Sequence, residues 1–410
     1  MEDDAPLFTG ELHTQDENVA YAGSAEGAPQ GPFDREIDCG GDLLLPGFKN
    51  AHTHSAGLFL RSFADDLPLK EWLYERMLPN EAHLTPDAAY ALTRLAILEY
   101  LTSGVTCMAD MYYYRPAVAQ ACADSGFRAL VMDGVNDFGG SPERTLQERA
   151  EVAACGPLVR HAVSVHAEYT TSLPLLTRMA ALLGELAEPC YIHMNETREE
   201  VDGCVMRHGV RPFELMDGVG LFDHGGVAYH CVHVSDNELA VMQRRGVIAV
   251  TCPASNCKLG SGVAPVQTLL ARGIPVGIGT DSAASNNALD MFREMYLVTA
   301  LQKLQHGADA MDALSVLRMA CCVGAAACGF PECGCLAAGR PADIVRIDLA
   351  QPNMHPLHNI PKNVVFAGSK QNVRMTMVAG RILYEDGRFH IGDDPARIYA
   401  QADAFVRSFS

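Results

Sequence analysis

The feature that most constrains the fold of this chain is a regular alternation of short β-like runs and amphipathic helical stretches, from Leu43 to about Phe330. The β-like runs read DLLLPGFKNAHTH, VTCMADMYYY, RALVMDGVND, HAVSVHAEYTT, PCYIHMNET, GVAYHCVHVS, VIAVTCPASN and PVGIGTDSAAS. Eight strands that alternate with helices are typical of a (β/α)₈ barrel of the TIM type, which takes about 250 residues. A doubly wound open sheet is the alternative, but no glycine-rich phosphate fingerprint follows the first run. We therefore expect an α/β protein whose residues 46–330 form a (β/α)₈ barrel.

Helix-capping signals support this alternation. Thr85 is a favourable N-cap residue and Pro86 a favourable first residue for a helix that runs to about residue 104. Ser235 and Glu238 form a capping box before a later helix, which the glycine at position 246 is expected to end. These signals place helices where a barrel needs them.

The two chain ends lie outside the barrel pattern. The C-terminal part contains three stretches with the composition of short strands, at residues 342–350, 363–368 and 373–389. Turns are expected at Ala379-Gly380 and Asp386-Gly387. The N-terminal part has few strand signals. We expect residues 1–45 and 331–410 to build a small β-sandwich domain together.

The charge balance and the absence of apolar spans limit the partners. The chain has 31 Lys and Arg against 50 Asp and Glu, a formal net charge of −19, which repels phosphate backbones. We expect no nucleic-acid polymer as a partner, although a single nucleoside needs only a local pocket. No apolar stretch approaches the length of a membrane span, and the start MEDDAPLFTG lacks the features of a signal peptide. Fourteen scattered cysteines without an export signal favour reduced thiols. We expect a cytoplasmic protein that forms a homo-oligomer and binds no membrane.

Side chains capable of metal binding or acid–base chemistry stand at the ends of five of the eight predicted strands. They are His52, His54, His166, His193, Glu196, His230, His233 and Asp281. Each alone has an ordinary explanation, such as a hydrogen-bonded scaffold histidine or a helix-capping aspartate. In a barrel, however, the carboxyl ends of all strands meet at the face that carries the catalytic groups. Three neutral imidazoles and one carboxylate suit Zn²⁺, with Fe²⁺ or Mn²⁺ as substitutes. The sequence therefore predicts a metal site.

Five segments together resemble the amidohydrolase superfamily, in its branch of aminohydrolases that act on purine nucleosides. They are PGFKNAHTHSAG, HMNET, AYHCVHVSD, CPASNCKLGSGVAPV and GTDSAASNN. Within this branch the chain is most similar to the 5′-methylthioadenosine/S-adenosylhomocysteine deaminases, from Leu43 to about Phe389. The resemblance implies one metal ion per chain, held by His52, His54, His193 and Asp281. It further implies His230 near the metal-bound water, Glu196 as proton shuttle, Glu81 on the ribose hydroxyls and His166 on the bound nucleoside.

The chemistry of deamination agrees with these roles. Hydrolytic attack on an amidine-like ring carbon needs a hydroxide at neutral pH, which metal coordination supplies. A ring nitrogen must gain a proton as the tetrahedral centre forms, and Glu196, three residues past His193, is placed to give it. Asp281 is placed to take a proton from the water and later to help protonate the departing ammonia. His230 is placed to orient the hydroxide.

Two features of the sequence bear on the number of metal ions and on the 5′ group of the substrate. Members with two metals bridge them through a carboxylated lysine or a carboxylate, and the fourth run, HAVSVHAEYTT, has no lysine. Its nearest acid is Glu168, two residues past His166, so we expect one metal.

Members that accept S-adenosylhomocysteine hold its carboxylate with arginines. Asp133 stands at one of these positions, and Arg144 is expected near the second. A carboxylate at Asp133 repels a carboxylate tail, which favours adenosine, 5′-deoxyadenosine or 5′-methylthioadenosine as substrate.

Other functions remain open at this point. An amidohydrolase that deaminates or dechlorinates another heterocycle (guanine or pterin, pyrimidine or triazine) uses the same metal motifs. Glu81 discriminates here, because a bare ring has no ribose for it to bind. A non-enzymatic binding protein is disfavoured by the intact ligand set together with Glu196. The tyrosines at residues 112–114 can stack on a purine, although a tyrosine cluster at a strand end more often serves packing.

Overall fold

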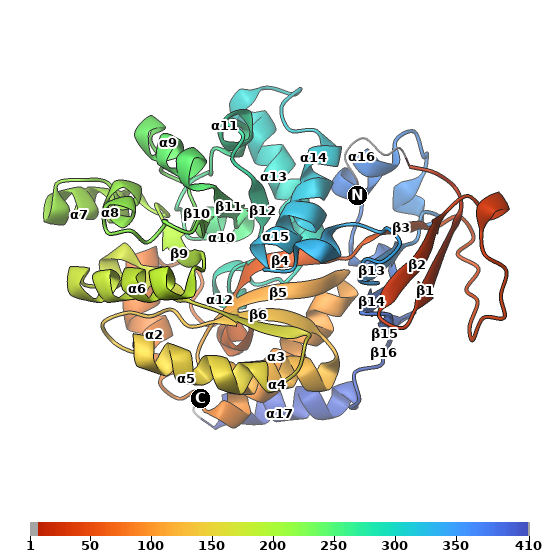
Figure 1. Cartoon of the computed structure of the whole chain (residues 1–410), viewed down its shortest axis with the longest axis horizontal. Coiled ribbons are helices and arrows are strands. Elements are labelled where there is room, and N and C mark those ends of the chain that lie inside the picture. Colours follow the sequence, from red (N-terminus) through yellow and green to blue (C-terminus); the bar gives the residue numbers. More distant parts are fainter. Residues whose placement is uncertain (1–6, 409–410) are drawn as a thin grey trace.

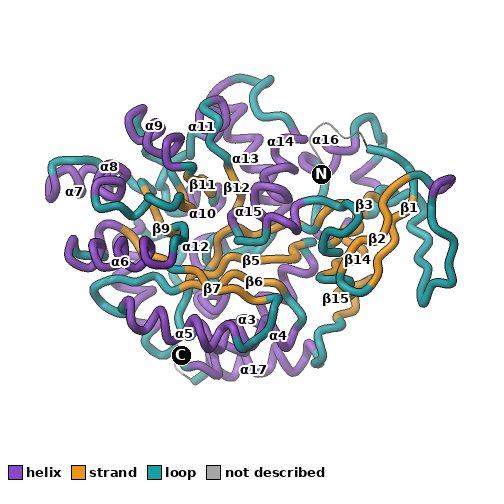
Figure 2. Tube along the Cα trace, in the orientation of Figure 1, coloured by secondary structure: helices purple, strands orange, loops and turns teal. Residues whose placement is uncertain are grey.

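The β-like runs of the sequence form a ring of parallel strands, as the alternation predicts (Figures 1 and 2). The computed structural model describes residues 7–408, so residues 1–6, which include the acidic start, lie outside the described part. In chain order the barrel strands are β4 (Phe48–Thr53), β5 (Val105–Met111), β6 (Arg128–Met132), β7 (Val159–Ala162), β8 (Ser164–Ala167), β9 (Cys190–Met194), β10 (Gly226–His230), β11 (Val247–Thr251) and β12 (Val276–Ile278). The expected fourth strand is thus split into β7 and β8.

Two hydrogen-bonded sheets make up the ring. One runs β4-β5-β6-β7 and the other β12-β11-β10-β9-β8. A parallel bridge between Val135 and Val165 joins the sheets on one side, and a bridge between Thr53 and Asp281 joins them on the other. The second bridge is also a close contact between site residues, because the Asp281 amide donates to the His52 carbonyl at 2.9 Å. Barrel closure therefore brings the first and last strand ends together.

The helices that surround the ring follow the predicted caps. The main ones are α3 (Pro86–Thr102), α4 (Arg115–Ser125), α5 (Pro142–Ala153), α6 (Leu173–Leu186), α7 (Arg198–His208), α8 (Pro212–Gly218), α9 (Asp236–Arg245), α11 (Val266–Ala271), α13 (Met291–His306) and α14 (Ala313–Arg318). The Thr85 side chain accepts from the Ala88 amide at 3.2 Å. Ser235 and Glu238 form the expected capping box, and the chain leaves α9 at Gly246 with φ +65°. Both helix predictions are confirmed.

Both chain ends supply a separate antiparallel β-sheet domain, as expected. Its five-stranded sheet has the order β16-β15-β14-β13-β3. The strands are β3 (Leu43–Pro46), β13 (Ile344–Ile347), β14 (Val373–Val378), β15 (Arg381–Glu385) and β16 (Arg388–Phe389). The hairpin of β1 (Glu11–Gln15) and β2 (Asn18–Gly23), which the sequence signals did not predict, packs Val19 against Ile344 and Met375 of this sheet. Both predicted turns are confirmed, and Ala379 and Asp386 have positive φ.

Two features of the C-terminal part differ from the expectation. Residues 363–368 were expected as a strand, but they end α16 (Ile360–Phe366), because Asn359 caps a helix by accepting from the Lys362 amide at 2.9 Å. The last helix, α17 (Pro395–Arg407), lies along α3 on the barrel (Figure 1). There Phe405 packs against Phe59, with ring centroids 5.4 Å apart. The limits 1–45 and 331–410 of the small domain stay a prediction.

A buried charge cluster joins the barrel to the small domain. Asp343, just before β13, accepts two hydrogen bonds from the Arg128 guanidinium at 2.9 and 3.0 Å. The Lys49 ammonium, 0% exposed, lies 3.8 Å from the same carboxylate and donates to Thr106 at 2.7 Å. Burial would raise the pKa of Asp343, but Lys49 and Arg128 hold it below its usual value. Two barrel strands are thereby tied to the small domain through one carboxylate.

Replacing Asp343 with asparagine is expected to lower the free energy of unfolding by about 3–5 kcal/mol, because two buried cations lose their counter-charge. Urea unfolding of wild type and variant measures the change. Asp236→Asn is the matched control, because Asp236 is 84% exposed in its pair with Arg272 and such pairs contribute about 0–1 kcal/mol. Equal midpoints for Asp343→Asn and the control would contradict the expectation.

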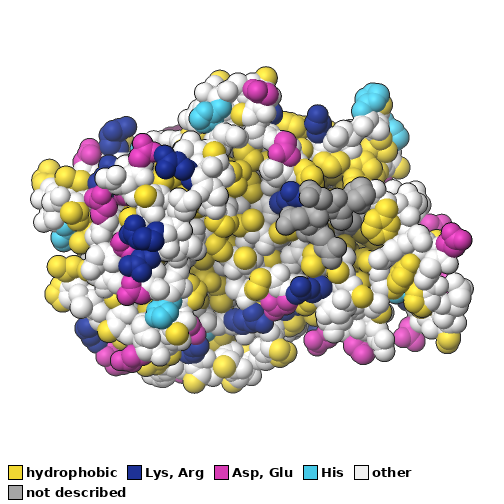
Figure 3. Space-filling view, turned by 45° about the horizontal axis from the view of Figure 1, so that its top comes forward, with side chains coloured by type: hydrophobic (Ala, Val, Ile, Leu, Met, Phe, Trp, Pro, Cys, Tyr) yellow, Lys and Arg dark blue, Asp and Glu magenta, His cyan; other side chains and the backbone are white. Residues whose placement is uncertain are grey.

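The surface carries acidic and basic side chains close to one another. Figure 3 shows this on one face, where Asp and Glu lie beside Lys and Arg. Among the described residues, no helix combines the length and the apolar character needed to cross a membrane.

Candidate active site

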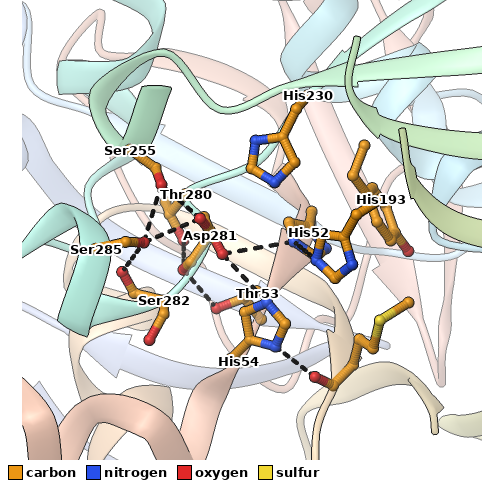
Figure 4. Close-up of polar contacts among 12 residues, drawn as sticks. His52, Thr53, His54, His193, His230, Ser255, Thr280, Asp281, Ser282 and Ser285 are labelled. Carbon is orange, nitrogen blue, oxygen red and sulfur yellow. Dashed lines mark hydrogen bonds and ion pairs between the residues drawn. The ribbon is translucent and has the colours of Figure 1, made fainter. Parts of the chain in front are cut away.

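The strand-end histidines and Asp281 converge at the carboxyl end of the barrel (Figure 4). His52 and His54 leave the end of β4, His193 lies on β9, and Asp281 follows β12. The Asp281 Oδ1 atom lies 3.2 Å from His54 Nε2 and 3.5 Å from His52 Nε2, and His52 Nε2 lies 3.1 Å from His193 Nε2. The candidate ligand atoms of His52, His54 and Asp281 all lie within 4.8 Å of one another, as do those of His52, His193 and His230. The four residues predicted as metal ligands are therefore in one place.

Backbone carbonyls fix the tautomers that a metal site requires. His54 Nδ1 faces the Met111 carbonyl at 2.5 Å, and His193 Nδ1 faces the His166 carbonyl at 2.7 Å. A carbonyl only accepts, so each Nδ1 carries the proton and each Nε2 keeps its lone pair for the cluster. Burial lowers the pKa of His52 to about 3 and that of His193 well below its usual value. The Nε2 atoms of His52 and His193 lie 3.1 Å apart, so one cation can contact both. The donor set therefore fits a divalent metal ion.

Asp281 is held as an ionised ligand. Its Oδ2 atom accepts from Ser255 at 2.5 Å and from Ser285 at 2.9 Å, which leaves Oδ1 to face the histidines. Burial would raise the pKa of Asp281, but the adjacent imidazoles of His52 and His54 hold it well below its usual value. Such outer contacts orient metal-binding carboxylates.

Glu196 and His230 form a second pair beside the cluster. Glu196 Oε2 lies 3.8 Å from His230 Nε2, and its Oε1 accepts from Ser261 at 3.2 Å. His230 Nδ1 donates to the Asn256 side-chain oxygen at 2.8 Å, so the Nε2 lone pair faces the site. Burial raises the pKa of Glu196, which keeps a proton on this carboxyl closer to neutral pH. The pair can therefore hold and pass a proton.

The backbone is strained where these side chains leave their strands. Asn195, His230 and Asp281 have φ of +52°, +68° and +60°, a region that costs non-glycine residues about 1–3 kcal/mol each. Glu200 supports the first of these bends, because its carboxylate accepts from the Asn195 and Glu196 amides at 2.8 Å each. All three residues lie at or next to strand ends that carry the site.

A cavity of about 590 Å³ opens from the cluster and contains the predicted nucleoside contacts. Glu81, on α2 (Leu78–Glu81), lines it and accepts from the Tyr112 hydroxyl at 2.7 Å. The Tyr112 side chain thus holds a carboxylate, a role different from the stacking or simple packing considered from the sequence. Burial raises the pKa of Glu81. His166 also lines the cavity, and its Nδ1 contacts the Thr170 hydroxyl at 3.0 Å.

Two strand-end residues turn away from the chemistry. His233 Nε2 contacts the Ser261 carbonyl at 2.8 Å, which matches the scaffold role that a lone strand-end histidine often has. Glu168 is 3% exposed and pairs with Arg207 and, at 3.1 Å, with His208, both on α7. Glu168 therefore anchors α7 and does not bridge a second metal.

The far wall of the cavity carries three charged side chains. Asp133 and Arg144 line the cavity, and their predicted influence on the 5′ group stays a prediction. Asp133 is 1% exposed, and its oxygens accept from Thr145 and, at 3.4 Å, from Ser164. Arg115 also lines this wall, although the sequence interpretation missed it. Arg115 directly follows the tyrosines that end the second predicted strand, and this position could have marked it as a site residue.

Other site residues were also missed. Asn256 orients His230, and it lies in the segment CPASN that carried part of the resemblance. Trp72 lines the cavity, and its buried indole nitrogen has no partner among the described residues. Trp72 belongs to a short helical segment (Trp72–Met77) with no strand end or capping signal to mark it.

Comparisons with known proteins agree with this geometry. A curated relative, the 5-methylthioadenosine/S-adenosylhomocysteine deaminase of Nitratidesulfovibrio vulgaris, is 41% identical over 404 residues, covering 96% of this chain and 92% of that protein. The 5′-deoxyadenosine deaminase of Methanothermobacter thermautotrophicus is 39% identical over 369 residues, covering 88% of this chain and 86% of that protein. A crystal structure of an adenosine deaminase from Xanthomonas campestris with bound zinc superposes with a TM-score of 0.85 at 34% identity, covering 90% of this chain and 86% of that chain.

The sequence profile of the Amidohydrolase family matches residues 43–383. This range includes every barrel strand and all residues of the candidate metal cluster. The family match and the similarity to these relatives confirm the resemblance seen in the sequence: the chain belongs to the amidohydrolase family.

Proposed function

We propose that this protein is a zinc-dependent hydrolase that deaminates an adenosine-type nucleoside to the inosine analogue and ammonia. The observation that carries the proposal is one cavity with the His52, His54, His193 and Asp281 cluster, Glu196 beside it, and Glu81 on its wall. Relatives named as nucleoside deaminases support the substrate class, and the zinc-bound adenosine deaminase structure supports the metal.

The metal and this chain's own residues have separate tasks. A zinc ion held by the four ligands would lower the pKa of a water molecule and so supply the nucleophile. Asp281 stays ionised, and its Oδ1 atom, which no serine occupies, is the acceptor for a proton of the attacking water. His230 Nε2, fixed by Asn256, orients that water from the other side.

Proton supply to the substrate falls to Glu196. When water adds to the ring carbon that bears the amino group, that carbon becomes tetrahedral and the adjacent ring nitrogen needs a proton. The Glu196 carboxyl, whose pKa burial raises, gives this proton. When the tetrahedral centre collapses to a carbonyl, the amino group takes the proton held by Asp281 and leaves as ammonia, and the hydroxyl proton returns to Glu196. No net proton is consumed by the enzyme.

Substrate orientation falls to the cavity wall. The Glu81 carboxylate, held by Tyr112, accepts from the ribose hydroxyls, and His166 contacts the base. These positions hold the ring carbon over the ligand cluster, and such orientation contributes strongly to rate.

The proposal extends to partners and location. The formal charge of −19 supports a protein that binds no nucleic-acid polymer and no membrane surface. All fourteen cysteines are free thiols, most of them buried, which supports a reducing, cytoplasmic setting. A homo-oligomer is part of the proposal and is tested by sedimentation velocity.

A nucleoside panel tests the function. Purified protein is expected to convert adenosine, 5′-deoxyadenosine or 5′-methylthioadenosine to the inosine analogue, followed as loss of absorbance near 265 nm with release of ammonia. Guanine, a pterin, cytosine and a chlorotriazine form the comparison set. Turnover of a bare heterocycle without turnover of any nucleoside would establish the other amidohydrolase function instead.

The metal has its own test. We expect about one Zn²⁺ per chain, because one set of three imidazoles and a carboxylate holds one ion. Elemental analysis measures it, and treatment with a chelator followed by Zn²⁺, Fe²⁺ or Mn²⁺ shows which ions restore turnover. Two tightly held ions per active chain would contradict the single site.

A further inference from the structure

The far wall of the cavity carries two arginines and one acid, and a second acid, Glu148, pairs with both arginines. Arg115 opens α4, Asp133 follows β6, and Arg144 and Glu148 lie one turn apart on α5. Arg115, Asp133 and Arg144 line the cavity. A nucleoside whose base lies at the metal cluster and whose ribose contacts Glu81 has its 5′ substituent left to face this remaining wall.

Glu148 is the centre of this group. Its Oε2 atom accepts from Arg115 Nε at 2.5 Å, and its Oε1 atom accepts from Arg144 Nε at 2.8 Å. Glu148 and Arg115 are 6% and 5% exposed, whereas the Arg144 side chain is 52% exposed. One buried carboxylate therefore serves two guanidinium groups, and each of its oxygens is used by a different arginine.

The local charges balance. Two guanidinium groups face two carboxylates, Glu148 and Asp133, and Asp133 adds its charge from a position held by Thr145 and Ser164. Burial raises the pKa of Asp133, and the charges of Arg115 and Glu148 act on it in opposite directions, so these groups share one electrostatic environment. Without Glu148, the two arginines would outweigh the single remaining acid and attract an anion.

We propose that Glu148 sets the substrate preference, because its charge cancels the arginines and leaves a subsite for a 5′ substituent without net charge. This inference rests on the proposed nucleoside deaminase function and specifies its substrate class. An anionic substituent is repelled by Asp133, and both arginines are already paired with Glu148. A cationic substituent is repelled by the two guanidinium groups. Mismatched charge in a partly buried site is strongly disfavoured.

Wild-type enzyme provides the first test, through three 5′-thioadenosines of equal chain length. They carry a propyl, a 2-carboxyethyl and a 3-aminopropyl group on sulfur, and so differ mainly in charge. The value of kcat/KM for the neutral compound is expected to exceed both others by about tenfold or more. An anionic compound that matches or exceeds the neutral one would overturn the inference, as would a preferred cationic one.

Glu148→Gln tests the residue itself. It keeps the shape but removes the negative charge, so the ratio of kcat/KM for the carboxyethyl to the propyl compound is expected to rise about tenfold. The matched control is Glu143→Gln on the same helix, where the carboxylate is 72% exposed in its pair with Arg178. The control ratio is expected to equal that of wild type. An unchanged ratio in folded Glu148→Gln would overturn the role of Glu148.

The two proposals fail in different ways. If no adenosine-type nucleoside is deaminated by wild type, the proposed function itself is wrong. If the nucleosides are deaminated but the charge series shows no preference for the neutral compound, only the inference about the far wall is wrong. Circular dichroism and zinc content of Glu148→Gln separate a specificity change from misfolding, and the wild-type series decides the question even if this variant does not fold.

Discussion

Glu196→Gln is expected to lower kcat by about 10²–10⁴-fold, the usual contribution of a positioned general acid, while zinc content and fold stay those of wild type. Glutamine keeps the shape of the side chain and can still accept from Ser261, but it cannot give a proton. Glu196 is 6% exposed, lies 3.8 Å from His230 and lines the same cavity as the metal cluster. Substrate binding uses Glu81 and His166, so KM is expected to change much less than kcat.

A neighbouring exposed glutamate supplies the control for this variant. Glu199 lies three residues further on, is 72% exposed and contacts only Lys70 at 3.5 Å, so Glu199→Gln is expected to turn over like wild type. Steady-state kinetics with zinc-replete proteins measures both variants. Turnover of Glu196→Gln within a few-fold of wild type would show that another group supplies the proton.

The metal cluster could be predicted from the sequence because its members share one local signal. His52, His193 and Asp281 each stand at or just past an apolar strand run. A barrel brings all carboxyl strand ends to one face, so a linear pattern becomes a three-dimensional cluster without knowledge of the packing. The structure then adds what a pattern does not contain, namely the carbonyls of Met111 and His166 that fix which imidazole nitrogen faces the cluster.

The far wall could not be predicted in this way. Arg115 and Glu148 are 33 positions apart and lie on different helices, so their pairing depends on how α4 and α5 pack. Asp133 was predicted to face the 5′ group, but its hydrogen bonds to Thr145 and Ser164 depend on the same packing. The far wall thus depends on contacts between segments, whereas each member of the metal cluster carries its own strand-end signal.

Local patterns also failed where a cap decided between strand and helix. The apolar residues of NVVFAG suit a strand, but Asn359 and the proline after Ile360 start a helix that the apolar pattern alone does not show. Conversely, β1 and β2 are half exposed and gain a partner only from the small domain's sheet, so their own residues give little strand signal.

Glu81→Ala is expected to lower kcat/KM for a ribonucleoside by about 10²-fold or more, because each hydrogen bond to a charged group contributes roughly 1.5–3 kcal/mol. The Glu81 side chain lines the cavity, where the side chains of Tyr112 and Tyr113 both contact its carboxylate. Tyr112→Phe removes only the group that holds the carboxylate and is expected to cost less. Glu75 is an exposed residue of the preceding segment (Trp72–Met77) and supplies the control. Glu75→Ala is expected to behave as wild type.

A comparison of adenosine with 2′,3′-dideoxyadenosine separates ribose recognition from a general loss of structure. Wild type is expected to discriminate strongly against the dideoxy compound, because a site built to bond hydroxyls rejects an analogue that lacks them. In Glu81→Ala the acceptor is gone, so the two compounds are expected to be used almost equally. The loss of kcat/KM on removing the hydroxyls is thus measured once in wild type and once in Glu81→Ala. The difference between the two losses gives the interaction energy of the carboxylate with the hydroxyls. If Glu81→Ala weakens both compounds by the same factor, Glu81 shapes the cavity without contacting the ribose, and the argument for a nucleoside over a bare heterocycle loses its structural support.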